Sequence, residues 1–424
     1  MKIIGFDSWT GGAHHFERLL PALEELSIRL TLVHLGSWGN EPKCLPEQKI
    51  NNLLTRDIKY YGNDSFERIL DIEMPDAVIL LSTDTFAHRA FIRLCEKRSI
   101  PTLNLYHGLV AATSSETTAC TTSRPAQTRL VIAKIGKLLR HTLPCYISAL
   151  LKTKASVEEW RRFLSDIFHL MIGDNYFMVG AKDARTTKCA VYIQADVEHA
   201  MRFYGFKQED VFVVGNPDLI QFDLDEKMLV SWTRPEISQP SVMYIETGFS
   251  SVGLFFSSTE DFANHLISTS RSLAVQGFRM CLKLKPHGSN VHLIKKHLEG
   301  SGIELVSNEL FLPKLIACSA CISETSSLAI VPALMGMPLL LAKYGRLNSL
   351  GFGELLTNYP RAYVLEDVSD VSNILLKDAR TFDVGEINTW KNLNMGPSPI
   401  NKMPQRVAEI IDKMIVSNDR AESA

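Results

Sequence analysis

The chain has 424 residues and a balanced composition, with 46% hydrophobic and 22% charged residues, as in soluble globular proteins. Its 45 basic and 47 acidic residues give a net charge of -2, so no overall field attracts nucleic acid or an acidic polymer, and we expect no nucleic-acid partner. This length exceeds one ordinary domain and favours two.

The cysteines and the apolar runs indicate in which cellular compartment the protein lies. The eight cysteines are scattered and several lie in apolar runs, which favours reduced thiols. Cys318 and Cys321 form a single C-x-x-C without a second pair, and we interpret them as buried strand residues. The first residues lack the apolar core of a signal peptide, and no apolar run reaches 18 residues. We therefore expect a cytoplasmic protein.

Strand and helix signals alternate through the first hundred residues. Short apolar runs predict strands, and apolar residues at helical spacing separate them, which is the βαβ order of a doubly wound sheet. In chain order, the pattern predicts a strand at 2–6, a helix at 13–26, strands at 29–34 and 77–81, a helix at 86–97 and a strand at 102–105.

A basic segment near 125–160 interrupts this alternation. Its apolar residues recur at helical spacing, six lysines and arginines lie between 129 and 154, and no acid occurs between Glu116 and Glu158. Pro144 should kink or split the segment. One interpretation is an amphipathic element that rests on an anionic membrane surface. The other is a helical hairpin packed on its own domain, or an oligomer contact.

Alternation resumes after this segment and continues to the end of the chain. The later elements are predicted as strands at 190–193, 211–214, 242–245, 280–284, 304–306, 320–322 and 338–342, and helices at 195–204, 262–276, 291–298, 312–318, 328–335 and 403–415. The polar segment 222–240 contains Pro235 and Pro240 and predicts a linker.

These patterns predict an α/β protein with two Rossmann-like domains facing a cleft. The predicted divisions are an N-terminal acceptor domain at 1–221 with the insertion near 125–160, a linker at 222–240, a C-terminal nucleotide-donor domain at 241–395 and a terminal helix within 396–424. A cleft between two such domains is the usual place for a site.

Polar residues follow the first strand of the N-terminal domain. Gly11 and Gly12 allow close backbone approach to a ligand, but the G-x-G-x-x-G spacing of a dinucleotide fingerprint is absent. We expect these glycines and His15 to shape an acceptor loop, and Asp7 and His14 to contact the acceptor or act as a base. The alternative is that they are caps and surface polar residues.

His107 follows the strand predicted at 102–105 and precedes Gly108. A histidine at the carboxyl end of a strand can act as a general base, since its ordinary pKa lies near neutrality. The alternative is a turn histidine beside a flexible glycine.

Two motifs of the C-terminal domain suit a phosphorylated ligand. Lys285 and His287 lie at the end of one strand and place positive charge where ligands bind to parallel sheets. A second group of polar side chains follows the strand predicted at 320–322 and precedes a helix, whose N-terminus favours anions. This group comprises Ser323, Thr325, Ser326 and Ser327.

A further turn follows the first strand of this domain at Glu246, Thr247 and Gly248. Glu246 is expected to bind a ribose or sugar hydroxyl or to act as acid or base, and the next two residues to approach a phosphate. A purely structural loop is the equal alternative.

Taken in order, these motifs resemble those of GT-B fold glycosyltransferases. The order is Gly-Gly-x-His, His-Gly, Gly-Asn-Pro-Asp, Lys-x-Lys-Pro-His, Ser-x-x-Ser-Ser and Gly-Met-Pro. More narrowly, it is similar to the bacterial envelope-glycan group of CDP-glycerol glycerophosphotransferases, capsule polysialyltransferases and Kdo transferases. Gly288 stands where that group usually has proline.

The resemblance implies roles for these positions. His287 would contact the donor phosphate with added charge from Lys285, the hydroxyls at 323–327 would hold the phosphate, His107 would act as base, and His14 would lie on the acceptor side. It further implies a cytoplasmic enzyme, peripheral on the inner face of the membrane, that needs no metal or other cofactor.

Its expected activity is transfer of a sugar from a nucleotide-activated donor to a glycan or lipid-linked acceptor of the bacterial surface, such as capsule or lipopolysaccharide. The alternatives are a nucleotide-sugar 2-epimerase, a CDP-glycerol-type glycerophosphotransferase, or a non-catalytic assembly protein that retains the fold.

Overall fold

The computed structural model divides the chain into two compact units, which we call unit 1 and unit 2. Unit 1 comprises Met1–Gly108, Leu130–Gly215 and Lys402–Ala424, and unit 2 comprises Leu109–Arg129 and Asn216–Asn401. Within these limits the structure describes residues 1–39, 41, 43–62, 65–112, 136, 138–171, 185–222, 224–236, 239–248, 255–285 and 290–422.

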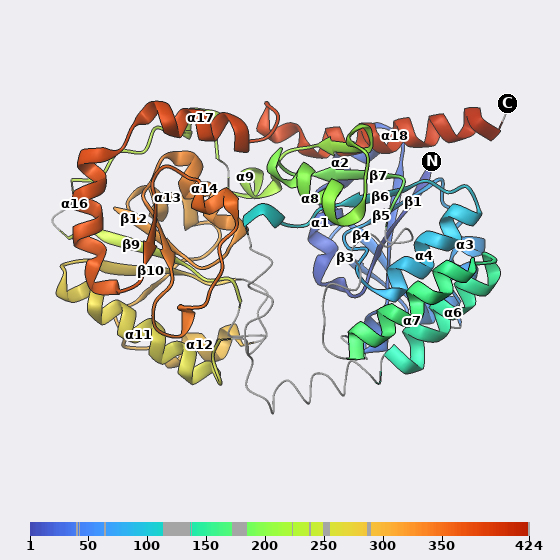
Figure 1. The fold of residues 1–424 in the computed structure, drawn as a ribbon, viewed down its shortest axis with the longest axis horizontal. Coiled ribbons are helices and arrows are strands. Elements are labelled where there is room, and N and C mark those ends of the chain that lie inside the picture. The colour runs from blue at the N-terminus through green and yellow to red at the C-terminus, as the bar shows by residue number, and fades with distance from the viewer. Residues whose placement is uncertain are drawn as a thin grey trace. The chain divides into compact units, whose positions relative to one another are not determined.

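Unit 1 is built on an eight-stranded sheet with the order β3-β4-β2-β1-β5-β6-β7-β8 (Figure 1). All neighbours pair in parallel except β3 with β4. The strands are β1 (Lys2–Asp7), β2 (Arg29–His34), β3 (Glu47–Ile50), β4 (Leu53–Asp57), β5 (Ala77–Leu80), β6 (Thr102–Leu105), β7 (Lys188–Val191) and β8 (Val211–Val213). The helices are α1 (Ala13–Glu17), α2 (Leu20–Glu25), α3 (Phe66–Glu73), α4 (Phe86–Lys97), α6 (Leu143–Lys152), α7 (Val157–Met171), α8 (Ala195–Tyr204) and α18 (Met403–Glu422).

The core of unit 1 forms where the central strands meet α3 and α4. Phe6 of β1 has no exposed surface and stacks on Phe91 of α4, with ring centroids 4.2 Å apart. Phe66 of α3 contacts both rings edge-on. Thr85 precedes α4, and its hydroxyl accepts the His88 N–H, which caps that helix. Apolar strands and a capped amphipathic helix therefore fix the sheet on which the site residues lie.

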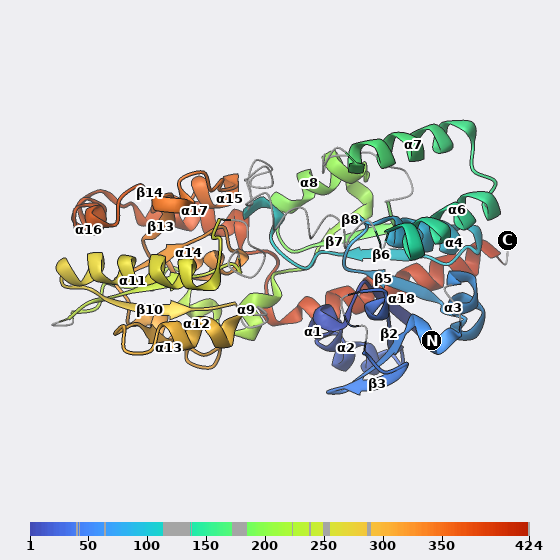
Figure 2. The ribbon, with the colours of Figure 1, turned by 90° about the horizontal axis from the view of Figure 1, so that it is seen from below.

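The part of the basic segment that the structure describes contains α6, and α6 and α7 pack on α4. Arg89 of α4 is 1% exposed and donates to the Asp166 carboxylate of α7 at 2.7 Å and to the Tyr146 hydroxyl of α6 at 2.8 Å. Figures 1 and 2 show α6 next to α4. Apolar side chains nevertheless remain outward, with Leu151 64% and Phe168 60% exposed. The helices thus pack internally on one face and leave apolar groups on the other.

Unit 2 has a six-stranded sheet with the order β11-β10-β9-β12-β13-β14, and all neighbours pair in parallel. The strands are β9 (Ser241–Ile245), β10 (Arg279–Lys283), β11 (Glu304–Leu305), β12 (Ala320–Ser323), β13 (Leu339–Ala342) and β14 (Ala362–Leu365). The helices are α9 (Pro217–Gln221), α11 (Thr259–Val275), α12 (Val291–His297), α13 (Phe311–Ile316), α14 (Ile330–Met335), α15 (Glu354–Thr357), α16 (Val371–Thr381) and α17 (Val384–Asn394).

The chain passes from unit 1 to unit 2 at the Gly-Asn-Pro-Asp motif. Gly215 has φ +105°, a conformation that side chains rarely adopt. The Asn216 side chain accepts the Asp218 N–H at 2.9 Å and caps α9, with Pro217 at its first position. The described residues of 222–240, where we expected a linker, hydrogen-bond within unit 2. For example, the Val230 N–H donates to the Leu334 carbonyl at 2.9 Å.

Both units are layered α/β structures around parallel sheets, which confirms the predicted fold class. Cys321 lies in β12 and Cys318 is buried just before it. Among the helices that the structure describes, none is long and apolar enough to cross a membrane.

Candidate functional site

The order of strands in unit 1 reverses beside β1. β1 pairs with β2 on one side and with β5 on the other, so the connections leave in opposite directions there. Ligands of open α/β sheets bind at such a switch point, outside the carboxyl ends of the strands. Asp7 ends β1, Leu81 follows β5 and His107 follows β6. The topology therefore brings the predicted residues of the N-terminal domain to one edge.

The geometry of His107 defines its tautomer. Its Nδ1 lies 2.8 Å from the Leu81 carbonyl oxygen. Since a carbonyl only accepts, Nδ1 carries the hydrogen and Nε2 is left as a proton acceptor. The side chain is exposed, and the His15 ring lies edge-on with its centroid 6.0 Å away. An exposed imidazole with an oriented basic nitrogen is suited to general base chemistry.

Asp7 is a buried carboxyl beside this imidazole. It is 8% exposed, and its Oδ1 accepts the Ser8 N–H at 2.6 Å. Burial raises the pKa of Asp7 to about 6, against the opposing effects of that hydrogen bond and of His107. A Cβ on Gly12 would overlap the Asp7 carboxylate and lie 2.9 Å from a Leu81 methyl. Glycine at this position therefore lets the loop close over the carboxyl group.

The rest of the loop presents histidines at the surface. His14 is exposed, and its Nδ1 donates to the Gly11 carbonyl at 3.2 Å. Its ring lies 3.9 Å from that of His15. A Cβ on Gly11 would come within 2.6 Å of the Trp9 indole, so the second glycine lets the loop pack on that ring. The structure thus brings together all the predicted residues of the N-terminal domain.

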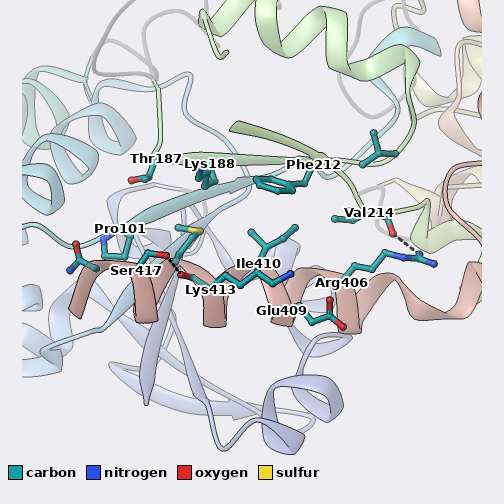
Figure 3. Close-up of a pocket in the computed structure, with 13 residues that line it drawn as sticks. Pro101, Thr187, Lys188, Phe212, Val214, Arg406, Glu409, Ile410, Lys413 and Ser417 are labelled. Atoms are coloured by element: carbon teal, nitrogen blue, oxygen red, sulfur yellow. Dashed lines mark hydrogen bonds between the residues drawn. The ribbon is translucent and has the colours of Figure 1, made fainter. Parts of the chain in front are cut away.

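A cavity of about 520 Å³ in unit 1 contains none of these residues. It lies between α18 and strands β7 and β8, with Ile410 and Lys413 of the helix facing Phe212 and Lys188 of the strands (Figure 3). The Arg406 guanidinium donates to the Val214 carbonyl at one end, at a distance of 3.0 Å. The predicted site residues of unit 1 therefore lie outside this cavity.

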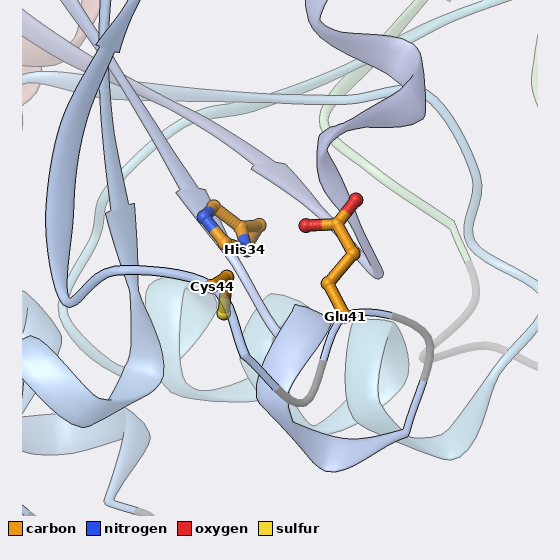
Figure 4. Close-up of side chains that lie close together, drawn as sticks. All are labelled: His34, Glu41 and Cys44. Atoms are coloured by element: carbon orange, nitrogen blue, oxygen red, sulfur yellow. The ribbon is translucent and has the colours of Figure 1, made fainter.

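Three side chains next to the acceptor loop have the chemistry of metal ligands. His34, Glu41 and Cys44 each bring one ligand atom within 4.8 Å of the others (Figure 4). Nitrogen, oxygen and sulfur donors in such proximity are found in zinc sites. Among the residues that the structure describes, this is the one group of three possible metal ligands that lie this close together.

Hydrogen bonds already account for this cluster. The Gly36 N–H donates to His34 Nδ1 at 3.2 Å, and the Cys44 thiol donates to the Asp57 carboxylate at 3.2 Å. Burial and the bond to Asp57 raise the pKa of Cys44 to about 11, which disfavours the thiolate that binds metal. We assign the cluster a structural role, because Glu41 accepts the Thr10 N–H at 3.0 Å and anchors the acceptor loop.

The strand order of unit 2 reverses beside β9. Ile245 at the end of β9 pairs with Lys283 of β10 on one side and with Ser323 of β12 on the other. The residues that follow these three strands therefore lie at one edge of the sheet, at its switch point. They include Glu246, Thr247, Gly248, Lys285 and Glu324.

Two buried carboxylates hold these strand ends together. Glu324 accepts the Thr247 N–H at 3.0 Å and its hydroxyl at 2.7 Å, and also the Tyr244 hydroxyl at 2.9 Å. Glu246 accepts the Lys285 N–H at 3.0 Å and the Gly248 N–H. The oxygens of Glu246, which we expected to contact a sugar hydroxyl, are turned toward backbone amides. Glu324 is not among the site residues that the sequence predicted, and this contact was missed.

Lys283, which ends β10, and Lys285, which follows it, differ in role. Lys283 is 3% exposed, and its ammonium donates to Asn308 Oδ1 at 2.7 Å. Burial lowers its pKa. Lys285 is exposed, and its aliphatic chain lies over Gly248, where a Cβ would come within 3.0 Å of its Cδ. Gly248 has φ +92°, so both backbone and contact require glycine there. Lys285 is the cation that this edge presents to solvent.

The serine motif is divided between core and edge. Ser323 has no exposed surface and donates to the Glu324 carbonyl at 2.6 Å, so it lies in the core and not where we expected a ligand contact. The Thr325 hydroxyl is buried and has no hydrogen-bond partner among the described residues. Ser326 caps the short helical turn that runs into α14, and Ser327 reaches Asp218 at 3.5 Å. The predicted site residue at position 287 lies outside the described residues.

No protein-family model and no curated protein matches the sequence. Solved structures do match the fold. The UDP complex of MnaA from S. aureus is 12% identical, with a TM-score of 0.51 over 97% of this chain and 96% of that one. The wall teichoic acid polymerase TagF is also 12% identical, with a TM-score of 0.51 over 98% and 89%. The calicheamicin glycosyltransferase CalG4 is 12% identical, with a TM-score of 0.53 over 98% of both chains. This chain therefore has the two-unit GT-B fold that its motifs predicted.

Proposed function

We propose that this protein is a glycosyltransferase that binds a nucleotide-activated sugar in unit 2 and activates an acceptor hydroxyl in unit 1. The observation that carries this proposal is the group of ligand-binding features at the switch point of unit 2: the exposed cation Lys285, the tight turn at Gly248 and the buried hydroxyl of Thr325. A nucleotide diphosphate needs such cations and close backbone approach.

In this mechanism Lys285, with His287, neutralises the donor phosphate as negative charge develops on the leaving group. The bond between the sugar carbon and the phosphate oxygen breaks, and a bond forms between that carbon and the acceptor oxygen. The acceptor proton passes to Nε2 of His107, which its contact with Leu81 orients. These cations can take the leaving charge without a metal ion.

We further propose that the acceptor is a bacterial surface glycan or its lipid-linked precursor. The support is a set of outward apolar side chains on α6, on α7 and on the π-helical turn Leu138–Thr142 before α6. Leu139, Leu151, Leu164 and Phe168 are each at least 60% exposed. Basic residues flank these side chains, and such a surface suits an anionic membrane. We expect binding to anionic liposomes that weakens at high salt. Leu151→Asp with Phe168→Asp should abolish it, and failure of wild-type protein to bind any liposome would contradict it.

Ligand binding tests the donor site directly. A thermal-shift screen with CMP, CDP, UDP and GDP should raise the unfolding midpoint with at least one of them. Lys285→Ala should weaken that nucleotide about tenfold to hundredfold, the value of a charged hydrogen bond to phosphate. Lys377→Ala, which removes an exposed cation from α16 of the same unit, is the matched control. No response to any nucleotide, or an equal loss in both variants, contradicts the proposed donor site.

Turnover tests the acceptor side. His107→Ala should lower kcat by about a hundredfold to ten-thousandfold, the usual contribution of a general base, and leave the nucleotide Kd unchanged. Incubation of donor without acceptor separates transfer from the alternative of epimerisation, because an epimerase converts the donor alone. A CDP-glycerol-type transferase would respond to CDP. Unchanged nucleotide binding and cellular glycan in Lys285→Ala and His107→Ala would favour a non-catalytic protein.

A further inference from the structure

Glu246 and Glu324 form a continuous link across three strand ends of unit 2. Glu324 follows β12 and holds the backbone of Thr247, which follows β9. Glu246 in the same turn holds the backbone of Lys285, which follows β10. Three of the five hydrogen bonds to the pair come from backbone amides, so the carboxylates determine the path of both loops. The cation and the tight turn of the proposed donor site depend on this link.

The pair is buried, and neither carboxyl forms an ion pair with a described residue. Glu246 is 5% exposed and Glu324 has no exposed surface, and no ion pair within the described residues includes either group. Burial raises the pKa of both carboxyls, and for Glu324, where the charge of Glu246 adds to the effect, to about 7. Two neighbouring buried carboxyls lose their protons one after the other, because the first negative charge disfavours the second. The two pKa values are therefore properties of the pair and not of either residue.

The surroundings of the pair include few other titratable groups. Among the described residues, Tyr244 of β9 donates to Glu324, and Tyr344 after β13 lies near it. Lys283 and Lys285 at the end of β10 act on Glu246 through their charge. Burial raises the pKa of both tyrosines far above neutrality. Among the described residues around the pair, the groups that titrate near neutral pH are therefore the two carboxyls.

We propose that Glu246 and Glu324 are positioning residues that share one proton, set the shape of the donor loops, and take up a proton when a nucleoside diphosphate binds. This inference rests on the proposed donor site in unit 2. An anionic phosphate beside the pair disfavours its second negative charge, so binding and protonation favour each other. A neutral Glu324 can still accept from Thr247 through one oxygen, and the tyrosine hydroxyl can accept its proton.

Glu324→Gln separates hydrogen bonding from charge. The amide oxygen can accept both Thr247 groups, and the amide N–H can donate to Tyr244, so the loop contacts survive while the titratable proton is lost. Glu324→Leu removes the contacts as well and leaves the buried Thr247 N–H without an acceptor. Glu366→Gln is the matched control, since Glu366 follows β14 of the same sheet and is exposed.

Calorimetric titration with UDP and with CDP, at pH 6.5 to 8.5 in buffers of different ionisation enthalpy, measures the protons taken up. We expect wild type and Glu366→Gln to take up a fraction of a proton near pH 7. Glu324→Gln should bind about as tightly at pH 7 but take up fewer protons, namely those of the nucleotide and of the proposed phosphate contact His287. Glu324→Leu should bind at least about tenfold more weakly at every pH.

Two outcomes would overturn the proposal. One is proton uptake in Glu324→Gln equal to that of wild type, and the other is equal loss of affinity in the Gln and Leu variants. If wild type binds no nucleotide, the donor site fails, yet the pair is still tested in the free protein. Its unfolding midpoint should then fall between pH 5 and pH 8 by more in wild type and Glu366→Gln than in Glu324→Gln. Parallel curves for all three would refute the shared proton.

Discussion

Asp7 should limit the stability of unit 1 at neutral pH. Its pKa is raised from an ordinary 3.8 to about 6, chiefly by burial. A carboxyl with a raised folded-state pKa favours folding only in its protonated form, so stability falls as pH rises between about 4 and 6 and then stays constant. Each unit by which the pKa is raised corresponds to about 1.36 kcal/mol of folding free energy. The ionised form of Asp7 therefore destabilises the folded state by about 3 kcal/mol.

Asp7→Asn removes this cost and keeps the main local contact, because the amide oxygen can accept the Ser8 N–H. We expect the variant to be more stable than wild type by up to about 3 kcal/mol at pH 8, and by almost nothing at pH 4. Urea denaturation across that range measures the difference. For a unit of this size, 1 kcal/mol corresponds to about 2–4 °C in Tm, which provides a second measurement.

The matched control is Asp71→Asn, because the Asp71 side chain is 63% exposed. Its stability should differ from wild type by less than about 0.5 kcal/mol at every pH. A stability difference for Asp7→Asn that is the same at pH 4 and pH 8 would refute a raised pKa as its cause. We also expect the stabilised Asp7→Asn variant to have a lower kcat, since ionisable groups buried at functional sites often destabilise the fold while they support activity.

Two further substitutions test the packing that positions the site. Gly12→Ala places a methyl group against a buried carboxyl and should destabilise unit 1 by about 1–3 kcal/mol, as measured by urea denaturation. In the control Gly108→Ala the added methyl group meets nothing within 4 Å, and stability should change by less than about 1 kcal/mol. Equal effects of the two substitutions would refute the steric argument. Arg89→Met removes the buried partner of Asp166, which keeps only its contact with the partly exposed Arg162, and should cost up to about 3–5 kcal/mol. Arg98→Met, whose partner is exposed, should cost less than about 1 kcal/mol, and a similar loss in both would show that burial is not the reason.

The fold class was predictable because hydrophobic periodicity reports which segments are buried. The run at 2–6 has apolar side chains on both faces of the strand, as expected for a central parallel strand. The structure places β1 there, with Ile3, Ile4 and Phe6 fully buried. Segment boundaries were less predictable. The segment that contains Val230 was expected to be a linker, yet its backbone hydrogen-bonds within unit 2, since backbone groups can form such contacts whatever the side chain.

The candidate site was predictable in location but not in orientation. Residues that follow parallel strands are expected at one edge, so the positions of Asp7, His107 and Lys285 could be inferred from the order of elements. Which way a side chain turns depends on contacts between distant residues. The Glu324 carboxylate lies 77 positions from its partner Thr247, and no local pattern indicates that it turns inward. Ser323 was expected to contact the donor phosphate, but its hydroxyl donates to the Glu324 carbonyl within the core.

The two switch points differ in charge, which favours the proposed assignment of the donor to unit 2. Unit 1 places the carboxyls of Asp7 and Glu41 beside its loop, and these would repel a diphosphate. Unit 2 presents Lys285 outward and turns its two carboxyls inward to backbone amides. If the donor binds in unit 2, Asp7→Asn should leave the Kd for UDP or CDP unchanged while it alters turnover. A marked tightening of nucleotide binding in Asp7→Asn, through relief of that repulsion, would instead place the phosphate beside β1 and reverse the assignment of the two units.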